Sequence, residues 1–388
     1  MAGQLAQDAR ERLRQVAAEH VREDRVPGLV ALVATGDEVW AEALGTLTIG
    51  GPPVRRDSIF RIASTTKPVT AAATMALADE GLLDIEAPVD DLLPELADRR
   101  VLARMDGPLA DTVPADRPIT PRDLLTFTFG FGMFADMFTP AEPWPVVAAA
   151  DELGLGTFGP PDPAGRPDAD TWIAGLGGLP LIAQPGERWM YNTGASVLGV
   201  LLARAAGMPF ADVLRTRLFE PLSMTDTGFW TPQPDRLATA YQPGPDGLVV
   251  YDRPDGAWST PPAFADGAAG LVSTVDDLLA LARMLLRGGA GVLSAGAVRA
   301  MTSDQLTPAQ KAGGGLAPDM FATMSWGYGQ AVHPGGAFGW DGGLGTSWLV
   351  DPDRDLVVIV LTQRMWENPE LPPVHKDIQA AAYAALDG

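Results

Sequence analysis

A serine and a lysine stand three residues apart beside an apolar stretch, and together they have the composition of an activated nucleophile. Ser64 and Lys67 lie in the segment 60–68 (FRIASTTKP), and Lys67 is the only charged residue between Arg61 and Asp79. Burial lowers the proton affinity of a lysine, and a neutral amine can take the proton of a neighbouring serine hydroxyl. The alternative is a capping serine beside a lysine whose ammonium group extends to solvent.

The residues that follow predict the element that carries this pair. Residues 69–78 contain no charge, which is typical of a helix inside a core. Pro68 fits a first turn and Gly81 fits a C-terminal cap, so we expect a helix that begins at or just before Ser64. Ser64 and Lys67 then share one face of the helix N-terminus.

The composition excludes several other kinds of chemistry and partner. The 388 residues include no cysteine, so we expect no disulfide, thiolate zinc site, iron–sulfur cluster or cysteine nucleophile. The three histidines, His20, His333 and His375, are far apart, and the sequence has no HExxH, Walker or Rossmann motif. The net charge of −21 argues against nucleic acid and anionic membranes as partners. Residues 1–25 carry charges throughout and no stretch approaches a membrane span, so we expect a cytoplasmic protein.

Strand patterns gather at both ends of the chain and helical patterns fill the middle. We therefore predict an α/β (α+β) fold, with a central antiparallel sheet from both termini, flanking helices and an inserted, mainly helical region. The sheet region comprises residues 1–60 and 325–388, and the helical region with its long Pro- and Gly-rich loops comprises 61–324. Together they form one catalytic unit. The expected hairpins are 29–34 with 39–44 and 346–350 with 356–361, and the expected terminal helices are 4–24 and 374–386. Two stretches, 101–121 and 134–185, fit no regular element, and loops this long often form lids or binding walls.

Several segments match a known family in order along the chain. Segment 60–67 resembles a nucleophile segment, and residues 119–130 (ITPRDLLTFTFG) resemble the pattern I-T-x-R-x-L-L-T-H-T-S-G, with Phe127 and Phe129 in place of His and Ser. The chain thus resembles the serine β-lactamase and penicillin-binding-protein superfamily, specifically the class C-like branch that includes family VIII carboxylesterases. The resemblance implies a β-lactamase-like fold and an acyl-enzyme mechanism. The other matching segments are 82–93, 185–192, 219–227 and 269–278.

The resemblance extends to a catalytic tyrosine. Tyr191 occupies the tyrosine of the family's Tyr-x-Asn motif, where the phenol acts as a base or passes a proton to the leaving group. A nearby ammonium would lower the pKa of this phenol, whereas the alternative is a core tyrosine with a satisfied hydroxyl. Thr193 replaces the motif's asparagine, so the carboxamide that orients a substrate amide is missing unless Asn192 compensates.

A third motif is expected on the strand beside the site. Trp340, Asp341, Gly342 and Gly343 precede the hairpin strand 346–350, where the family has Lys-Thr-Gly or a variant. The N–H groups of Gly343 and Ser64 are the candidate oxyanion hole, and the alternative is a glycine-rich turn. Trp340 stands in place of the motif's lysine, so the site lacks a cation that could bind the carboxylate of a β-lactam. Phe127, Phe129 and Phe134 are candidates for an aromatic substrate pocket, although most aromatic residues are core residues.

Together these residues predict a serine hydrolase acting on carboxylic esters. Ser64 is expected to attack the acyl carbonyl, with Lys67 and Tyr191 sharing the proton transfers. Thr193 and Trp340 both weaken recognition of peptide-like or carboxylate-bearing substrates, which favours neutral small-molecule esters. No metal or organic cofactor is implied. The alternatives are a β-lactamase, a D-aminopeptidase or other amide hydrolase, an acyltransferase, or a catalytically silent binding or sensing homologue.

Overall fold

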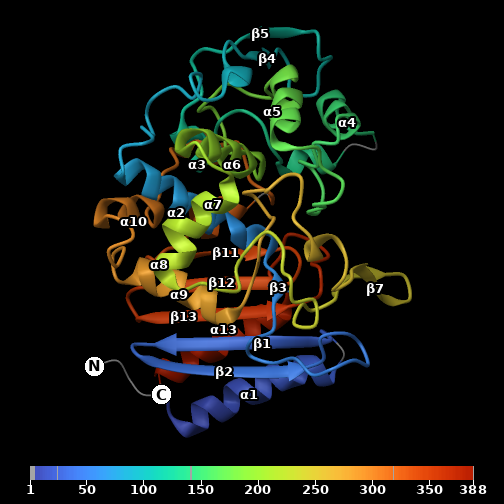
Figure 1. The fold of residues 1–388 in the computed structure, drawn as a ribbon, viewed down its shortest axis with the longest axis vertical. Coiled ribbons are helices and arrows are strands. Elements are labelled where there is room, and N and C mark those ends of the chain that lie inside the picture. Colours follow the sequence, from blue (N-terminus) through green and yellow to red (C-terminus); the bar gives the residue numbers. More distant parts are fainter. Residues whose placement is uncertain (1–4, 24, 140–141, 318, 388) are drawn as a thin grey trace.

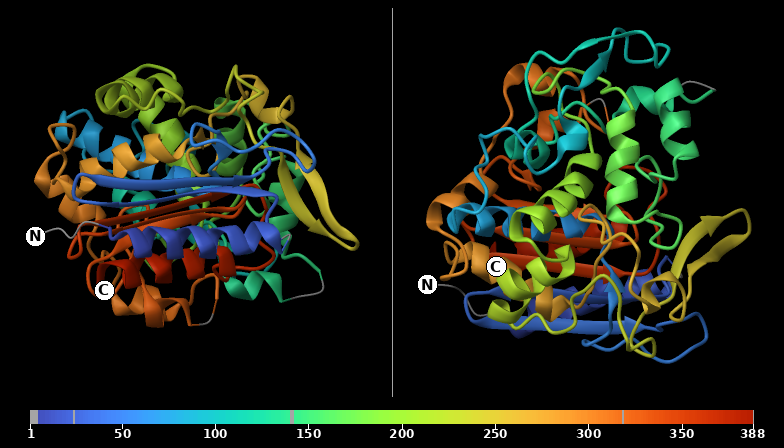
Figure 2. Two further views of the ribbon diagram at one scale, coloured as in Figure 1. Left: turned by 90° about the horizontal axis from the view of Figure 1, so that it is seen from below. Right: turned by 45° about the horizontal axis from the view of Figure 1, so that its top comes forward.

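In the computed structural model, which describes residues 5–23, 25–139, 142–317 and 319–387, an antiparallel sheet lies between two layers of helices (Figures 1 and 2). Its strands are β1 Gly28–Thr35, β2 Glu38–Gly45, β9 Ser325–Trp326, β10 Ala331–Val332, β11 Phe338–Gly342, β12 Thr346–Asp351 and β13 Leu356–Thr362. Over the described residues these seven strands run in the order β2-β1-β13-β12-β11-β10-β9. The predicted fold class, a sheet built from both termini with a helical insert, is confirmed.

The two faces of the central strands serve two separate cores. β1 pairs with β13 from Leu29 opposite Thr362 to Thr35 opposite Leu356. One face of β1 (Leu29, Ala31, Val33) packs against the terminal helices α1 Gln7–Arg22 and α13 Pro373–Asp387. The other face (Val30, Leu32, Ala34) packs against the helical region. Burial on both faces explains why this strand reads as a continuous apolar run.

The inserted region supplies the helices on the second face of the sheet. Helix α2 (Thr66–Asp79) contacts strand β11 and packs on α6 (Thr193–Ala206). The remaining helices are α3 Pro121–Leu125, α4 Pro145–Glu152, α5 Ala169–Gly178, α7 Phe210–Leu214, α8 Glu220–Leu222, α9 Val275–Leu286, α10 Ala295–Met301, α11 Pro308–Ala312 and α12 Met320–Thr323. Short 3₁₀ turns occupy Ala63–Thr65, Pro94–Leu96, Ala135–Phe138 and Ala257–Ser259, and a π turn occupies Arg215–Phe219.

Helix α6 is among the most deeply buried helices, because its residues 193–202 are all shielded from solvent. Within the described chain, no single helix has the length and apolar composition to cross a bilayer. The pair Thr193–Ala206 and Phe210–Leu222 meets that test only when joined, and an 80° bend separates its members.

Both predicted hairpins and both predicted terminal helices are present, but the middle of the chain contains strands that the sequence analysis did not predict. These are β3 Phe60–Arg61 with β8 Val272–Ser273, β4 Arg100–Leu102 with β5 Thr112–Pro114, and β6 Ala240–Gly244 with β7 Gly247–Asp252. The first four of these strands have only two or three residues, which is too few to show alternation, whereas β6 and β7 have five and six residues. β3 matters for the site because it leads directly into the turn that carries Ser64.

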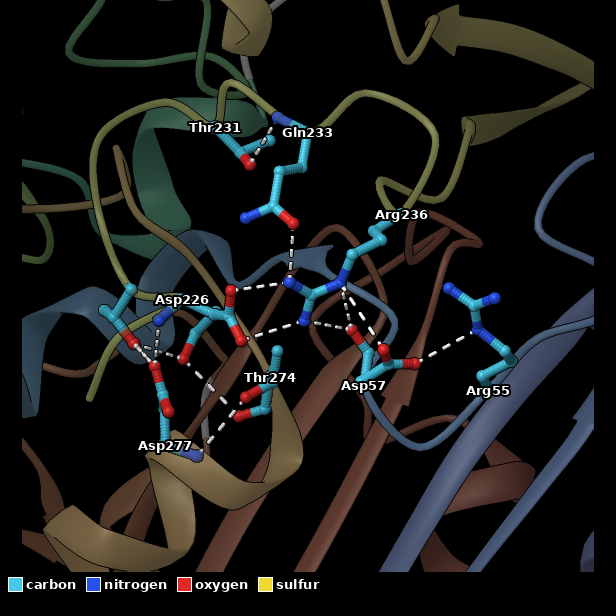
Figure 3. Close-up of polar contacts among 10 residues, drawn as sticks. Arg55, Asp57, Asp226, Thr231, Gln233, Arg236, Thr274 and Asp277 are labelled. Carbon is cyan, nitrogen blue, oxygen red and sulfur yellow. Dashed lines mark hydrogen bonds and ion pairs between the residues drawn. The ribbon is translucent and has the colours of Figure 1, made fainter. Parts of the chain in front are cut away.

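A polar network fixes the loop between α8 and β6 (Figure 3). Arg236 contacts both carboxylate oxygens of Asp226, at 2.7 and 2.8 Å. It also donates to the carbonyl oxygen of Asp57 and to the side chain of Gln233. The N–H of Asp226 donates in turn to Asp277 on α9 at 2.9 Å. The network therefore ties this loop to the segment before β3 and to a helix on the sheet.

Candidate active site

Ser64 and Lys67 lie where strand β3 turns into helix α2. Ala63 adopts a positive φ of 43°, a conformation that is costly for a residue with a side chain, and this sharp turn brings Ser64 to the start of the helix. Lys67 follows in the first turn of α2, and its Nζ lies 2.9 Å from the Ser64 hydroxyl oxygen. The predicted helix start and the predicted proximity of the two side chains are therefore both observed.

The lysine is enclosed rather than exposed, unlike in the alternative with a solvated ammonium group. Lys67 is only 1% exposed. Its Nζ also donates to the carbonyl oxygen of Ala268 at 2.8 Å and lies 4.4 Å from the centre of the Tyr191 ring. Burial lowers the pKa of Lys67 to about 7. A substantial share of the molecules therefore carries a neutral amine at neutral pH, which is the form that can accept a proton.

Tyr191 completes the cluster from the end of a short bridge. Its backbone pairs with Met133, and the next residue, Asn192, has a φ of 85° and begins α6. The Tyr191 hydroxyl hydrogen-bonds to the Ser64 side chain and accepts the indole N–H of Trp340 at 2.7 Å. The expected lowering of the phenol pKa is wrong. Burial raises the pKa of Tyr191 well above its usual value, so this hydroxyl stays protonated at neutral pH and is not a standing phenolate.

Strand β11 borders the cluster on the opposite side. A Cβ on Gly342 would collide with the carbonyl of Ile62, so glycine allows this strand to pack directly on the turn before Ser64. Gly343 follows and lines the same cavity as Ser64, which brings both candidate oxyanion donors to one wall. Asp341 also lines the cavity and pairs across the sheet with Ser347; burial raises the pKa of its carboxyl group to about 6.

The cluster opens into a cavity of about 450 Å³ with mostly apolar walls. The indoles of Trp340 and Trp366 form part of these walls. Among the described lining residues, the charged side chains are Arg166 and Asp341. The flexible apolar lining comes from Met133, Leu316, Met320, Met324, Met365 and Leu371. A cavity of this size and character suits an uncharged small molecule.

Five candidate substrate-binding residues do not line the cavity, and one of them is Gly342, which packs on the turn before Ser64. Phe127, Phe129, Phe134 and Thr193 are at most 1% exposed, and none of them is among the residues that line the cavity. Phe127 supports the site indirectly, because its ring contacts the Tyr191 ring at 5.9 Å. These phenylalanines fill the core, which is the alternative considered for them above. Asn192 does line the cavity, but its amide donates to the carbonyl of Thr157 at 3.3 Å.

The sequence analysis missed the methionine-rich wall and Arg166. Arg166 belongs to the stretch 134–185, which was singled out only as a possible binding wall, and no local pattern distinguishes this arginine from others. The sequence analysis considered Trp340 only as a residue that stands in place of a lysine. In the structure its indole N–H donates to the hydroxyl of Tyr191, a catalytic candidate. Within the described ranges, no group of three or more His, Cys, Asp or Glu residues is placed to hold a metal ion.

Comparison with known proteins agrees with this geometry. The sequence model of the Beta-lactamase family matches residues 13–383. The chain is 31% identical over 388 residues to Esterase EstB of Burkholderia gladioli, covering 92% of this chain and 91% of the relative. It is 37% identical over 332 residues to Protein Rv1367c of Mycobacterium tuberculosis, covering 81% and 79% of the two chains. The solved structure of EstCE1, a hydrolase with promiscuous acyltransferase activity, superimposes with a TM-score of 0.81 at 25% identity and covers 97% of this chain and 99% of its own.

The chain therefore belongs to the beta-lactamase family, and it has a beta-lactamase-like fold. The resemblance found in the sequence motifs is confirmed. Its relatives include esterases and a hydrolase that also transfers acyl groups.

Proposed function

We propose that this protein is a serine esterase that cleaves neutral carboxylic esters through an acyl-enzyme. The observation that carries the proposal is the 2.9 Å contact between the buried Lys67 amine and the Ser64 hydroxyl, at the base of an apolar cavity. A serine hydroxyl is a weak nucleophile until an adjacent base takes its proton. Lys67 is that base, because burial lowers its pKa to about 7 and so leaves a substantial share of the amine neutral near that pH.

The acylation step follows from the positions of these groups. Lys67 accepts the Ser64 proton as Oγ bonds to the ester carbonyl carbon, and the N–H groups of Ser64 and Gly343 stabilise the resulting oxyanion. The proton passes through the Tyr191 hydroxyl to the departing alkoxide, which leaves as an alcohol. Water then attacks the carbonyl carbon of the acyl-enzyme and gives up a proton to the same pair. The pair returns this proton to Ser64 Oγ as the acyl–oxygen bond breaks, which releases the carboxylic acid and free Ser64.

The cavity supports a neutral substrate with an apolar acyl or alcohol group. Its walls carry methionine and leucine side chains, and Trp340 lines it as well. By resemblance to the family's third motif, Trp340 stands in place of a lysine. Arg166, the cation on the wall, is already paired with Asp266. A substrate carboxylate would therefore have to compete with Asp266 for this arginine.

Acyl transfer is a second candidate function. EstCE1 is described as a hydrolase with promiscuous acyltransferase activity, and its structure covers nearly the whole of this chain. An apolar wall also favours an organic alcohol over water as the group that attacks the acyl-enzyme. Product analysis with and without an added alcohol separates the two reactions.

Labelling and substrate profiling test the proposal together. The protein is treated with a fluorophosphonate, the adduct is mapped, and turnover of p-nitrophenyl esters and of a chromogenic cephalosporin is measured. We expect the adduct on Ser64, and we expect Ser64→Ala to lower ester kcat/KM by about 10³-fold or more. Ser303→Ala, which changes an exposed serine outside the cavity, is the matched control. A label elsewhere, or an active Ser64→Ala, contradicts the mechanism; faster cephalosporin turnover contradicts only the ester preference.

A further inference from the structure

A buried ion pair lies directly behind the catalytic lysine. Arg166, from the loop between α4 and α5, has its Nη1 2.8 Å from a carboxylate oxygen of Asp266, and the two side chains are only 5% and 7% exposed. Isolated charges are costly to bury, so such a pair persists only where each charge has a partner. The described acyl-enzyme steps do not use either residue.

The aspartate end of the pair holds the groups that position Lys67. One oxygen of Asp266 accepts the Ser196 hydroxyl of α6 at 2.6 Å and the N–H of Ala268 at 3.0 Å. The carbonyl oxygen of that same Ala268 accepts the Lys67 amine at 2.8 Å. The carboxylate therefore fixes both the acceptor of Lys67 and the first turns of the helix that follows Tyr191.

The arginine end of the pair reaches the cavity that receives substrate. Arg166 lines this cavity and donates through Nη2 to the carbonyl of Gly156 at 2.6 Å. Gly156 has a φ of 58°, and a Cβ there would lie 2.8 Å from the Arg166 Nε. Glycine at 156 thus makes room for the guanidinium group, which is held against the ring of Phe264 at 5.8 Å.

The two charges act on Lys67 in opposite directions. The titratable and charged groups around the Lys67 amine are Tyr191, which stays protonated, and the pair Asp266 and Arg166. Asp341 acts on the Tyr191 hydroxyl. Burial lowers the pKa of Lys67, Asp266 raises it, and Arg166 lowers it. Without Arg166, the Asp266 carboxylate would favour the ammonium form of Lys67, which cannot accept the serine proton.

We propose that Arg166 and Asp266 are a positioning pair for Lys67: Asp266 holds the lysine's acceptor in place, and Arg166 cancels the aspartate's charge so that the amine remains a base. The inference rests on the proposed function, in which Lys67 takes the Ser64 proton. Because Arg166 also lines the cavity, it links the cavity wall to the protonation of Lys67. Neither Arg166 nor Asp266 needs to contact the reacting atoms.

The test is the pH dependence of kcat/KM for a p-nitrophenyl ester in three variants. We expect Arg166→Gln to move the acidic limb upward by about 1 pH unit, because an uncancelled carboxylate stabilises the Lys67 ammonium. Asp266→Asn keeps an acceptor for the Ala268 N–H but removes the negative charge that balances Arg166. The remaining positive charge disfavours the Lys67 ammonium, so the acidic limb should move downward by a similar amount. The double variant should return it close to that of the unmodified protein. A purely structural role would not shift the limb in opposite directions.

Two controls make the outcome decisive. Arg236→Gln breaks an arginine–aspartate pair whose residues do not line the cavity, and it should leave the acidic limb in place. If Arg166→Gln does not fold, the sign of the shift in Asp266→Asn, and its reversal in the double variant, decide the question. Shifts in the same direction, or no shift, overturn the inference. If Ser64 is labelled and esters are cleaved while the limb stays fixed, only this inference fails; if Ser64→Ala remains active, the proposed function fails.

Discussion

Two arginine–aspartate pairs in this chain have similar distances but different surroundings. Arg236 meets Asp226 with two parallel contacts of 2.7 and 2.8 Å, and its remaining donors bind Gln233 and the carbonyl of Asp57 (Figure 3). Arg166 meets Asp266 with a single side-chain contact of 2.8 Å, in a more deeply buried place beside Lys67. One pair sits in a network that binds loops together, whereas the other sits next to a titrating amine.

The difference shows two uses of the same chemical partners. Arg236 and Asp226 form a pair of parallel hydrogen bonds, and the surrounding hydrogen bonds position the backbone of three segments. Around Arg166 the opposite charges lie at a site where burial has already reduced the charge of a lysine, so each affects the protonation of Lys67. We therefore expect changes near Arg236 to alter stability and changes near Lys67 to alter activity and its pH dependence.

The largest effect is expected for Lys67→Met, which removes the amine but keeps a similar apolar shape. Ester kcat/KM should fall by about 10³-fold or more because the base is lost. The substitution should not lower stability, and it should change how stability depends on pH. An unfolded lysine has a pKa near 10.4, and the folded value is about 7. Between these values the unfolded state binds more protons, so the free energy of unfolding of the unmodified protein rises with pH.

Lys67→Met should therefore flatten the rise in stability between pH 7 and pH 10 and should be no less stable than the unmodified protein at pH 7. Urea unfolding at pH 7 and pH 9.5 measures this. Arg236→Gln is the control, because arginine does not titrate in this range and its slope should be unchanged. An unchanged slope in Lys67→Met would show that the folded lysine has an ordinary pKa.

A smaller effect, on stability alone, is expected for Arg236→Gln. The side chains of Arg236 and Asp226 are 14% and 21% exposed, so the unpaired carboxylate is only partly hydrated. We expect the free energy of unfolding to fall by about 2 kcal/mol while ester kcat/KM stays within about twofold. Urea unfolding and steady-state kinetics on one preparation measure both. A large loss of kcat/KM with little loss of stability would erase the distinction between the two pairs.

The smallest effect is expected for Trp340→Phe, which removes the N–H donated to the Tyr191 hydroxyl at 2.7 Å. One hydrogen bond is worth about 1 kcal/mol, so kcat should fall by roughly 5- to 10-fold with little change in KM. Steady-state kinetics on a p-nitrophenyl ester measures this. Trp230→Phe, which changes an exposed indole outside the cavity, is the matched control. A rise in KM without a fall in kcat would show that Trp340 serves substrate binding instead.

Local patterns were enough to predict the closeness of Ser64 and Lys67, the helix that carries Lys67, and the main hairpins. Ser64, Lys67 and Pro68 are close in sequence, and their spacing fixes their geometry once the helix forms. Long-range partners left no such signal. Arg166 and Asp266 are one hundred residues apart, and nothing around Arg166 distinguishes it from the other arginines of a loop-rich chain. Phe127 was predicted to line a substrate pocket, but its ring packs in the core against Trp189 and Trp326, two residues that are distant in the sequence.

The pairing of β1 with β13 has a consequence for the order of events during synthesis. Residues 28–35 emerge from the ribosome early, yet one of their hydrogen-bonding neighbours is residues 356–362. Until that distant strand is made, the hairpin of β1 and β2 has an open edge of apolar residues, and contacts between such distant segments form slowly. The newly made chain therefore carries an unpaired, apolar strand edge until residues 356–362 have been made, and the central sheet can form only after that point.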